Sequence, residues 1–130
     1  MRINFYFPLF FLFLLKIHGQ NDPLIVSDSL AQSSWVEVQY RNMSLSERIG
    51  QLFMVNVASN QDKASTDKIS GLIKEQHIGG VIFSKGGPNR QAKLTNAYQA
   101  TSKIPLLIGM DAEWGLAMRL DSTYAFPWNM

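Results

Sequence analysis

The chain has 130 residues, enough for one domain with a hydrophobic core but not for two large domains. Its 12 basic and 10 acidic residues give a net charge of +2, which gives little support to nucleic-acid binding, because such proteins usually present a dense basic face. The absence of cysteine excludes a disulfide framework, a thiol nucleophile and a cysteine zinc site.

Residues 1–19 have the pattern of a secretory signal peptide. Arg2 precedes an apolar run that only Asn4 and Pro8 interrupt, and Gly19 is an acceptable residue before a cleavage site. An uncleaved membrane anchor is the alternative, but the run is shorter than the roughly 18–20 residues that span a bilayer. We therefore expect export to the bacterial periplasm or the outside, with no stable membrane span after cleavage. The remaining chain then has 10 basic and 10 acidic residues.

Residues 20–42 are expected to form an N-terminal arm or linker. Residues 20–34 are polar, with Asn-Asp-Pro near the start and serines near the end. Residues 35–40 fit either a short helix or an extended lead-in, because periodicity does not distinguish the two over so few residues. The domain itself is expected over residues 43–130.

The domain opens with a short helix and a strand. Ser44 and Glu47 have the spacing of a capping box, in which each side chain binds the other residue's backbone N–H, so a helix is expected to end near Gly50. Residues 51–57 are mostly apolar and rich in strand-forming types. Such a run without alternation is typical of a strand covered on both faces, as in a parallel sheet.

Two further helices and two further strands are predicted in alternation. The strands are expected over residues 81–83 and 106–110. One helix is expected to begin at Ser65 or Thr66 and to end near Gln76, and the other to run from Asn89 to residues 102–103. The residues expected to face the core are Ile69, Leu72 and Ile73 in the first helix, and Ala92, Leu94, Ala97 and Tyr98 in the second.

The predicted order β-α-β-α-β indicates an α/β fold with parallel strands. A doubly wound sheet and a (β/α)8 barrel of the TIM type are both compatible with this order. A doubly wound nucleotide-binding domain is disfavoured, because no Gly-x-Gly-x-x-Gly follows the first strand. Three strands and two crossover helices leave a sheet edge and a helix layer uncovered, so we expect the N-terminal part of a larger domain.

Polar residues follow the predicted strands, at the ends where parallel α/β folds collect their functional groups. The first strand offers Asn56, the second offers Ser84 and Lys85, and the third is followed by Asp111 and, eight residues later, Arg119. A carboxylate at the end of an apolar strand needs hydrogen-bond partners, which a ligand with several hydroxyl groups can supply. Arg119 could hold the same ligand or neutralise Asp111. The alternative is a capping Asp111 or a plain Asp–Arg bridge.

Other residues are interpreted as structural. Glu113 more often binds nearby backbone N–H groups than substrate, and we expect the chain to turn after it, which disfavours a catalytic carboxylate pair with Asp111. Residues 85–88 lack the Gly-Lys-Ser/Thr end of a P-loop and predict a tight strand-to-helix turn. His77 precedes its strand and is expected on the far side from the site. For Trp114 and Trp128, core packing is favoured over stacking on a sugar ring.

The sequence has no cluster with metal-ligand spacing, and no metal or other cofactor is expected. Ser44, Ser46 and Ser84 lack the context of a nucleophile elbow.

Taken together, several segments resemble the N-terminal domain of glycoside hydrolase family 3. Residues 43–53, with the sequence Met-Ser-Leu-Ser-Glu-Arg-Ile-Gly-Gln-Leu-Phe, resemble its opening, and residues 78–83 resemble its second strand. Residues 105–115, ending in Asp-Ala-Glu-Trp-Gly, together with Arg119 resemble its third strand and sugar-binding loop. Phe126 and Pro127 fit the end of that segment.

The resemblance implies a (β/α)8 barrel that hydrolyses β-O-glycosidic bonds with retention of configuration. Within the family the sequence is most similar to bacterial β-N-acetylhexosaminidases of peptidoglycan metabolism, with β-glucosidases as the alternative. By motif match, Asp111 and Arg119 would bind the sugar beside the scissile bond. The family's nucleophile lies on a later strand, so the resemblance implies no catalytic residue within this chain. A non-catalytic carbohydrate-binding or partner-binding fragment is the other interpretation.

Overall fold

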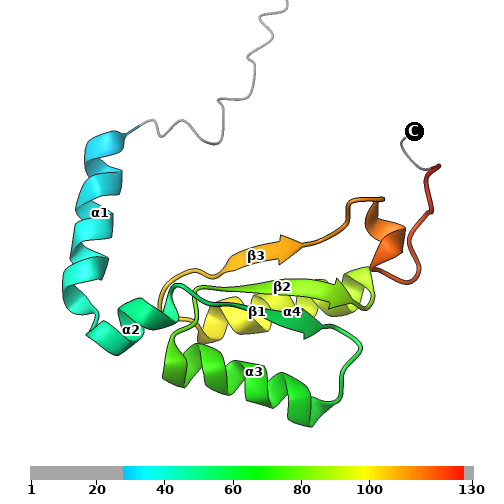
Figure 1. Cartoon of the computed structure of the whole chain (residues 1–130), viewed down its shortest axis with the longest axis horizontal. Helices are drawn as coiled ribbons and strands as arrows, with labels where there is room; N and C mark the ends of the chain where they lie inside the picture. Colours follow the sequence, from blue (N-terminus) through cyan, green and yellow to red (C-terminus); the bar gives the residue numbers. More distant parts are fainter. Residues whose placement is uncertain (1–27, 128–130) are drawn as a thin grey trace, which may run out of the picture.

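The computed structural model describes residues 28–127 (Figure 1). The predicted signal peptide at residues 1–19 and Trp128 lie outside the described residues. Among residues 28–127, no helix is both long and apolar enough to cross a bilayer. The elements, in order, are α1 (Ser29–Asn42), α2 (Leu45–Gly50), β1 (Met54–Ala58), α3 (Lys63–Gln76), β2 (Gly80–Lys85), α4 (Pro88–Thr101), β3 (Leu107–Met110) and the 3-10 helix η1 (Leu116–Met118).

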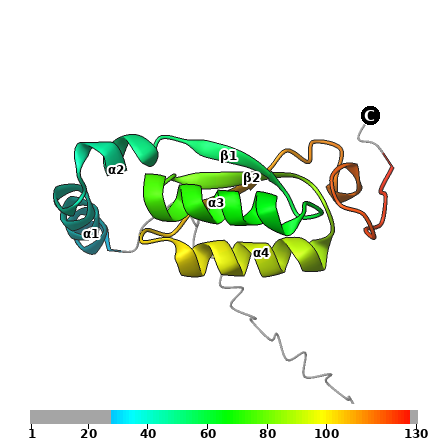
Figure 2. The ribbon, with the colours of Figure 1, turned by 90° about the horizontal axis from the view of Figure 1, so that it is seen from below.

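The three strands form one parallel sheet in the order β1-β2-β3, which confirms the predicted β-α-β-α-β arrangement. Each crossover passes through a helix, α3 between the first two strands and α4 between the last two. Both helices cover the same face of the sheet (Figure 2). All three strands therefore end at one edge, where the loops that follow them come together.

The helix starts differ from the predicted ones by a few residues. The capping box is present, since the Ser44 hydroxyl accepts from the Glu47 N–H and the Glu47 carboxylate accepts from the Ser44 N–H. However, α3 begins after Asp62, whose carboxylate accepts from the Ser65 N–H at 2.9 Å, so Ser65 lies inside the helix. Helix α4 begins at Pro88 instead of after Asn89, because proline fits the first turn, where its missing N–H costs no helical bond.

The first strand begins later than predicted. Residues 51–53 continue the end of α2 as a turn, in which the N–H groups of Gln51, Leu52 and Phe53 bond to carbonyls of that helix. Leu52 and Phe53 remain exposed in this turn, and pairing with β2 starts only at Met54, opposite Gly80. An apolar run thus marked the strand without marking its start.

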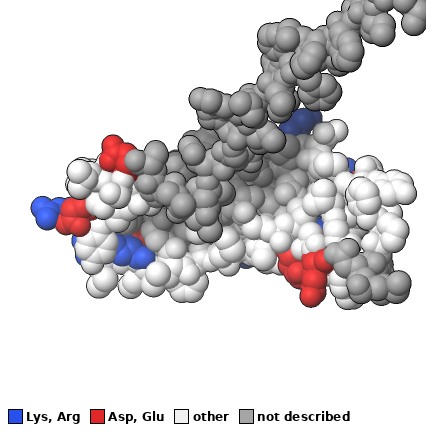
Figure 3. All heavy atoms as spheres, turned by 90° about the horizontal axis from the view of Figure 1, so that it is seen from above, with Lys and Arg blue, Asp and Glu red and all other residues white. Residues whose placement is uncertain are grey.

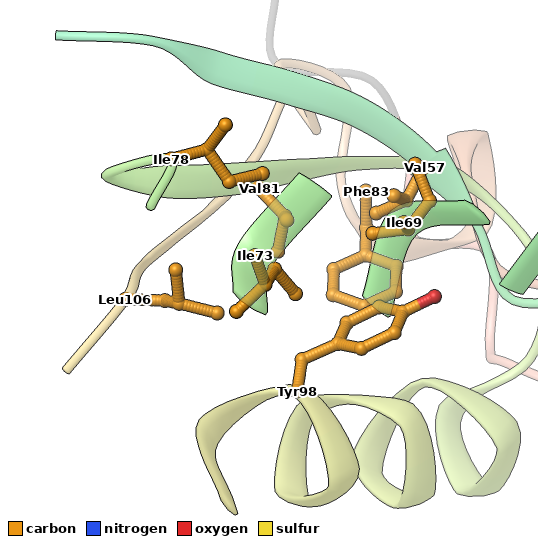
Figure 4. Packing of buried hydrophobic residues seen from close by; sticks show 8 residues of the cluster. All are labelled: Val57, Ile69, Ile73, Ile78, Val81, Phe83, Tyr98 and Leu106. Atoms are coloured by element: carbon orange, nitrogen blue, oxygen red, sulfur yellow. The ribbon is translucent and has the colours of Figure 1, made fainter. Parts of the chain in front are cut away.

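The core lies between the sheet and the two crossover helices (Figure 4). Figure 4 shows the Tyr98 ring extending from α4 toward Phe83 and Ile69. The predicted inward positions of α3 are confirmed, but in α4 only Tyr98 and Leu94 pack on the core, whereas Ala92 and Ala97 are exposed. The buried residues are Val57, Ile69, Ile73, Ile78, Val81, Phe83, Tyr98 and Leu106.

The other face of the sheet is not covered by any helix in the described part of the chain. The Met54 side chain extends over Gly80 and Gly109 on this face, and Leu107 is 71% exposed. Apolar strands covered on one side only are expected when a sheet is part of a closed barrel, whose interior is lined by the inner face of every strand.

Helix α1 occupies the second half of the predicted arm. Its start is capped by Asp28, whose carboxylate accepts from the Ala31 N–H at 2.8 Å. It has no buried residue, and Trp35 is half exposed. The helix therefore projects beside the sheet rather than forming part of the core (Figure 1).

Candidate functional site

The loops at the carboxyl edge of the sheet are joined by the buried hydroxyl of Ser59, which follows β1. The Ser59 N–H donates to the Lys85 carbonyl at 2.8 Å, and its Oγ accepts from the Gly87 N–H at 3.0 Å. Gly86 passes so close that an added Cβ would lie 1.8 Å from that Oγ, and its φ of +139° favours glycine. The glycines thus form the predicted tight turn, and close approach to Ser59 is the reason for Gly86.

The segment after β3 is tied to the same turn through its backbone. The Gly86 N–H donates to the Arg119 carbonyl at 3.1 Å, and the Asp121 N–H donates to the Gly86 carbonyl at 2.7 Å. An ion pair between Asp121 and Arg90 of α4 adds a side-chain contact. These bonds hold Arg119 at the end of β2, although it lies nine residues beyond the last residue of β3.

The structure brings the two predicted sugar-binding residues together. Arg119 Nη2 donates to Asp111 Oδ2 at 2.5 Å, and its Nε donates to the Asp111 carbonyl at 2.5 Å. The Asp111 side chain is 57% exposed, whereas the Arg119 side chain is 24% exposed. Among residues 28–127, no donor contacts the other carboxylate oxygen, Oδ1. The two residues therefore form the plain Asp–Arg bridge that was the alternative to ligand binding. The bridge also leaves one carboxylate oxygen of Asp111 open to solvent.

A second polar contact lies at the ends of β1 and β2. The Ser84 Oγ donates to Asn56 Oδ1 at 2.9 Å and lies 3.3 Å from the Val57 carbonyl. Lys85, the next residue, borders a cavity of about 330 Å³ that Arg119 also lines. The sequence predicted Asn56, Ser84 and Lys85 as separate polar residues at strand ends. In the structure, a hydrogen bond connects Asn56 and Ser84.

The chain turns immediately after Asp111, as predicted. The Gly115 N–H donates to the Ala112 carbonyl at 2.9 Å, and the φ of Gly115 is +93°. Glu113 is exposed on this turn and is not aligned with Asp111 along an extended strand. The prediction that Trp114 packs in the core is wrong, because its side chain is 55% exposed and borders a cavity of about 200 Å³ with Phe126.

His77 lies at the opposite end of the sheet, as expected, and ends α3 in a left-handed conformation. Its Nε2 is 3.5 Å from Glu47, which also binds Lys103 at 3.2 Å. Hydrogen bonds from the Ser44 backbone and hydroxyl, with a smaller contribution from Lys103, lower the pKa of Glu47 to about 2. This cluster joins α2 to the starts of β2 and β3 and is structural.

Residues 28–127 contain no group of three or more His, Cys, Asp and Glu side chains that could hold a metal ion. Figure 3 shows acidic and basic side chains on the same face, without a continuous basic surface among the described atoms visible there. What the carboxyl edge offers is a carboxylate, an amide, a hydroxyl and a guanidinium, groups that bind neutral polar ligands.

Sequence reasoning missed Ser59 and Asp121, although both organise the edge. Ser59 was one of several polar residues in a loop, and its burial depends on the approach of Gly86 from a distant turn. Asp121 acts through Arg90, 31 residues earlier, so no local spacing signals the contact.

A parallel α/β sheet with polar side chains gathered at the carboxyl ends of its strands defines the class: part of a barrel-type α/β domain. The family described as glycosyl hydrolase family 3 N terminal domain matches residues 44–130, and the chain belongs to this family. The three parallel strands and their helices correspond to the N-terminal part of that family's barrel domain.

A similar solved structure is that of β-glucoside phosphorylase BglX bound to 2FGlc. It is 27% identical to this chain, with a TM-score of 0.54. The match covers 66% of this chain but only 17% of that protein, so the sequence spans a small part of the solved chain's length. The comparison with curated proteins gave no match.

Proposed function

We propose that this chain supplies part of the sugar-binding half of an enzyme that hydrolyses β-O-glycosidic bonds with retention of configuration. The observation that carries the proposal is the Asp111–Arg119 pair at the carboxyl end of β3, within the segment matched by the family. The free Oδ1 of Asp111 accepts a hydrogen bond from a sugar hydroxyl, while Arg119 orients the carboxylate through its bonds to Oδ2 and to the Asp111 carbonyl.

Retaining hydrolysis needs two further groups that we assign to residues after Met130. A carboxylate nucleophile attacks the anomeric carbon as the bond to the leaving oxygen breaks, and a proton donor protonates that oxygen. Water then cleaves the covalent glycosyl-enzyme. Asp111 and Glu113 do not supply these roles, because Asp111 is paired with Arg119 and Glu113 lies on an exposed turn.

For the sugar, we propose terminal N-acetyl-β-hexosamine, on the basis of the Asp-Ala-Glu-Trp-Gly segment at residues 111–115. A β-glucosidase is an equally supported alternative, because the similar solved structure is described as a β-glucoside phosphorylase. Residues 1–19 support export to the periplasm or the outside as part of the same proposal.

The test uses the enzyme expressed with the residues encoded after Met130, and a matched sample of residues 20–130 alone. The longer protein is expected to hydrolyse an aryl N-acetyl-β-glucosaminide or an aryl β-glucoside, and NMR of the first-formed sugar should show the β anomer. The shorter sample should be inactive on both. Inversion of the anomer, or turnover by residues 20–130, would contradict the proposal, and a stop codon after Met130 would favour a non-catalytic binding fragment.

A further inference from the structure

Polar residues from all three strands lie near the carboxyl edge of the sheet, with Asn56 paired with Ile82, two residues before Ser84. Val57 is paired with Phe83, and Phe83 with Met110. Ser84 directly follows Phe83, and Asp111 directly follows Met110. These two residues therefore lie side by side at the ends of the neighbouring strands β2 and β3. Adjacent strands are about 4.8 Å apart, which is within reach of one sugar ring.

Strand alternation puts these polar side chains on the face that the helices do not cover. Phe83 is buried in the core and Met110 packs against it from the helix side, so the next residue on each strand, Ser84 or Asp111, starts on the opposite side. Asn56 precedes the buried Val57 and is likewise on the uncovered side, where its side chain is exposed. The polar row therefore consists of Asn56, Ser84 and Asp111.

An irregularity in the ladder brings two members of the row into contact. Ala58 is paired with Lys85, so Ser84 is an extra residue between two regular pairs. Its hydroxyl reaches Asn56 Oδ1 at 2.9 Å. With Oδ1 occupied by this donor, the Asn56 NH2 group has no acceptor among residues 28–127. The row thus presents two amide hydrogens from β1 and, on the far side of β2, a carboxylate oxygen that follows β3.

We propose that Asn56, oriented by Ser84, is a second sugar-binding residue of this site and donates its amide hydrogens to an oxygen of the same pyranose that binds Asp111. This inference rests on the proposed glycosidase function and adds to it. A pyranose carries oxygens that both donate and accept, so one hydroxyl donates to Asp111 Oδ1 while a neighbouring hydroxyl or acetamido oxygen accepts from Asn56 Nδ2. Ser84 is a positioning residue, because it acts through Asn56.

The experiment measures binding of N-acetylglucosamine and of glucose to the full enzyme by titration calorimetry. Asn56→Ala should raise the Kd of whichever sugar binds by about 3- to 10-fold, the cost of one neutral hydrogen bond. Ser84→Ala should act in the same direction, and Ser84→Thr should restore binding because it keeps the hydroxyl.

Two residues of α4 and α3 that lie away from the polar row provide matched controls. Asn96→Ala removes an amide of the same type, and Ser70→Ala removes a hydroxyl that bonds only to the Thr66 carbonyl. Both should leave the Kd within about twofold of the wild-type value. In NMR spectra, the Asn56 side-chain amide signals should shift on addition of the sugar.

The outcomes separate this inference from the function on which it rests. If Asp111→Ala abolishes sugar binding while Asn56→Ala binds like the wild type, the glycosidase site stands and the role of Asn56 is refuted. Asn56 amide signals that do not move in the sugar-bound wild type would refute that role as well. If the wild type binds neither sugar, the proposed function and this inference both fail.

Discussion

Replacing Asp111 by Asn separates a functional carboxylate from a merely structural one. The substitution removes the charge while keeping a similar shape. The Asp111–Arg119 pair is more than half exposed at the carboxylate, and exposed ion pairs contribute only about 0.2–1 kcal/mol to folding. Loss of a charged hydrogen bond to substrate costs about 1.5–3 kcal/mol, which corresponds to a fall in kcat/KM of roughly 10- to 100-fold.

The assay is steady-state hydrolysis of an aryl glycoside by the full enzyme, with the melting temperature measured on the same samples. Asp121→Asn is the matched control, because it breaks another exposed ion pair, with Arg90, in the same segment. Both variants should melt within about 4 °C of the wild type, and only Asp111→Asn should lose activity. If both variants keep wild-type kinetics, the sugar-binding role of Asp111 is refuted. Equal losses in both would mean that the loop, and not the carboxylate, matters.

Two further predictions concern stability. Gly86→Ala should destabilise the protein, because the added methyl group would lie 1.8 Å from Ser59 Oγ. Gly71→Ala, in α3 with nothing within 4 Å of the added methyl group, should stabilise the protein by about 0.5–1 kcal/mol. Urea unfolding measures both free energies, and an unchanged stability of Gly86→Ala would contradict the close approach to Ser59. Glu47 has a folded pKa of about 2, below its ordinary 4.5, so its contribution to stability is full above pH 4.5 and is lost as the pH falls through 2. Carboxyl NMR titration should find this low pKa, and Ser44→Ala should raise it; an ordinary pKa in the wild type would refute the capping geometry.

The order of strands and helices could be predicted because each element carries its own local signal. The capping box at Ser44 and the spacing of Ile69 and Ile73 depend on neighbours within one or two helical turns, and both are confirmed. The start of β1 could not be predicted in this way, because pairing at Met54 depends on where Gly80 lies in another strand.

The same division applies to the site. Asp111 and Arg119 could be proposed as partners because the strand end and the following loop are contiguous in sequence. The contact between Asn56 and Ser84 crosses 28 residues and depends on one extra residue in the ladder, which no pattern in the chain indicates. The exposure of Trp114 also escaped prediction, because an aromatic residue near a predicted site fits a core and a surface position equally well.

The backbone bridge between Gly86 and Leu120 concerns two properties of position 119, the location of its main chain and the identity of its side chain. The main chain there is held by the bonds from the Gly86 N–H to the Arg119 carbonyl and from the Asp121 N–H to the Gly86 carbonyl, and neither bond uses the Arg119 side chain. Exchange of Arg119 for lysine, glutamine or methionine therefore removes bonds to Asp111 but leaves both backbone bonds available. At the carboxyl edge, the backbone at position 119 is thus held separately from the ligand-facing side chain. This position is therefore suited to redesign of ligand preference.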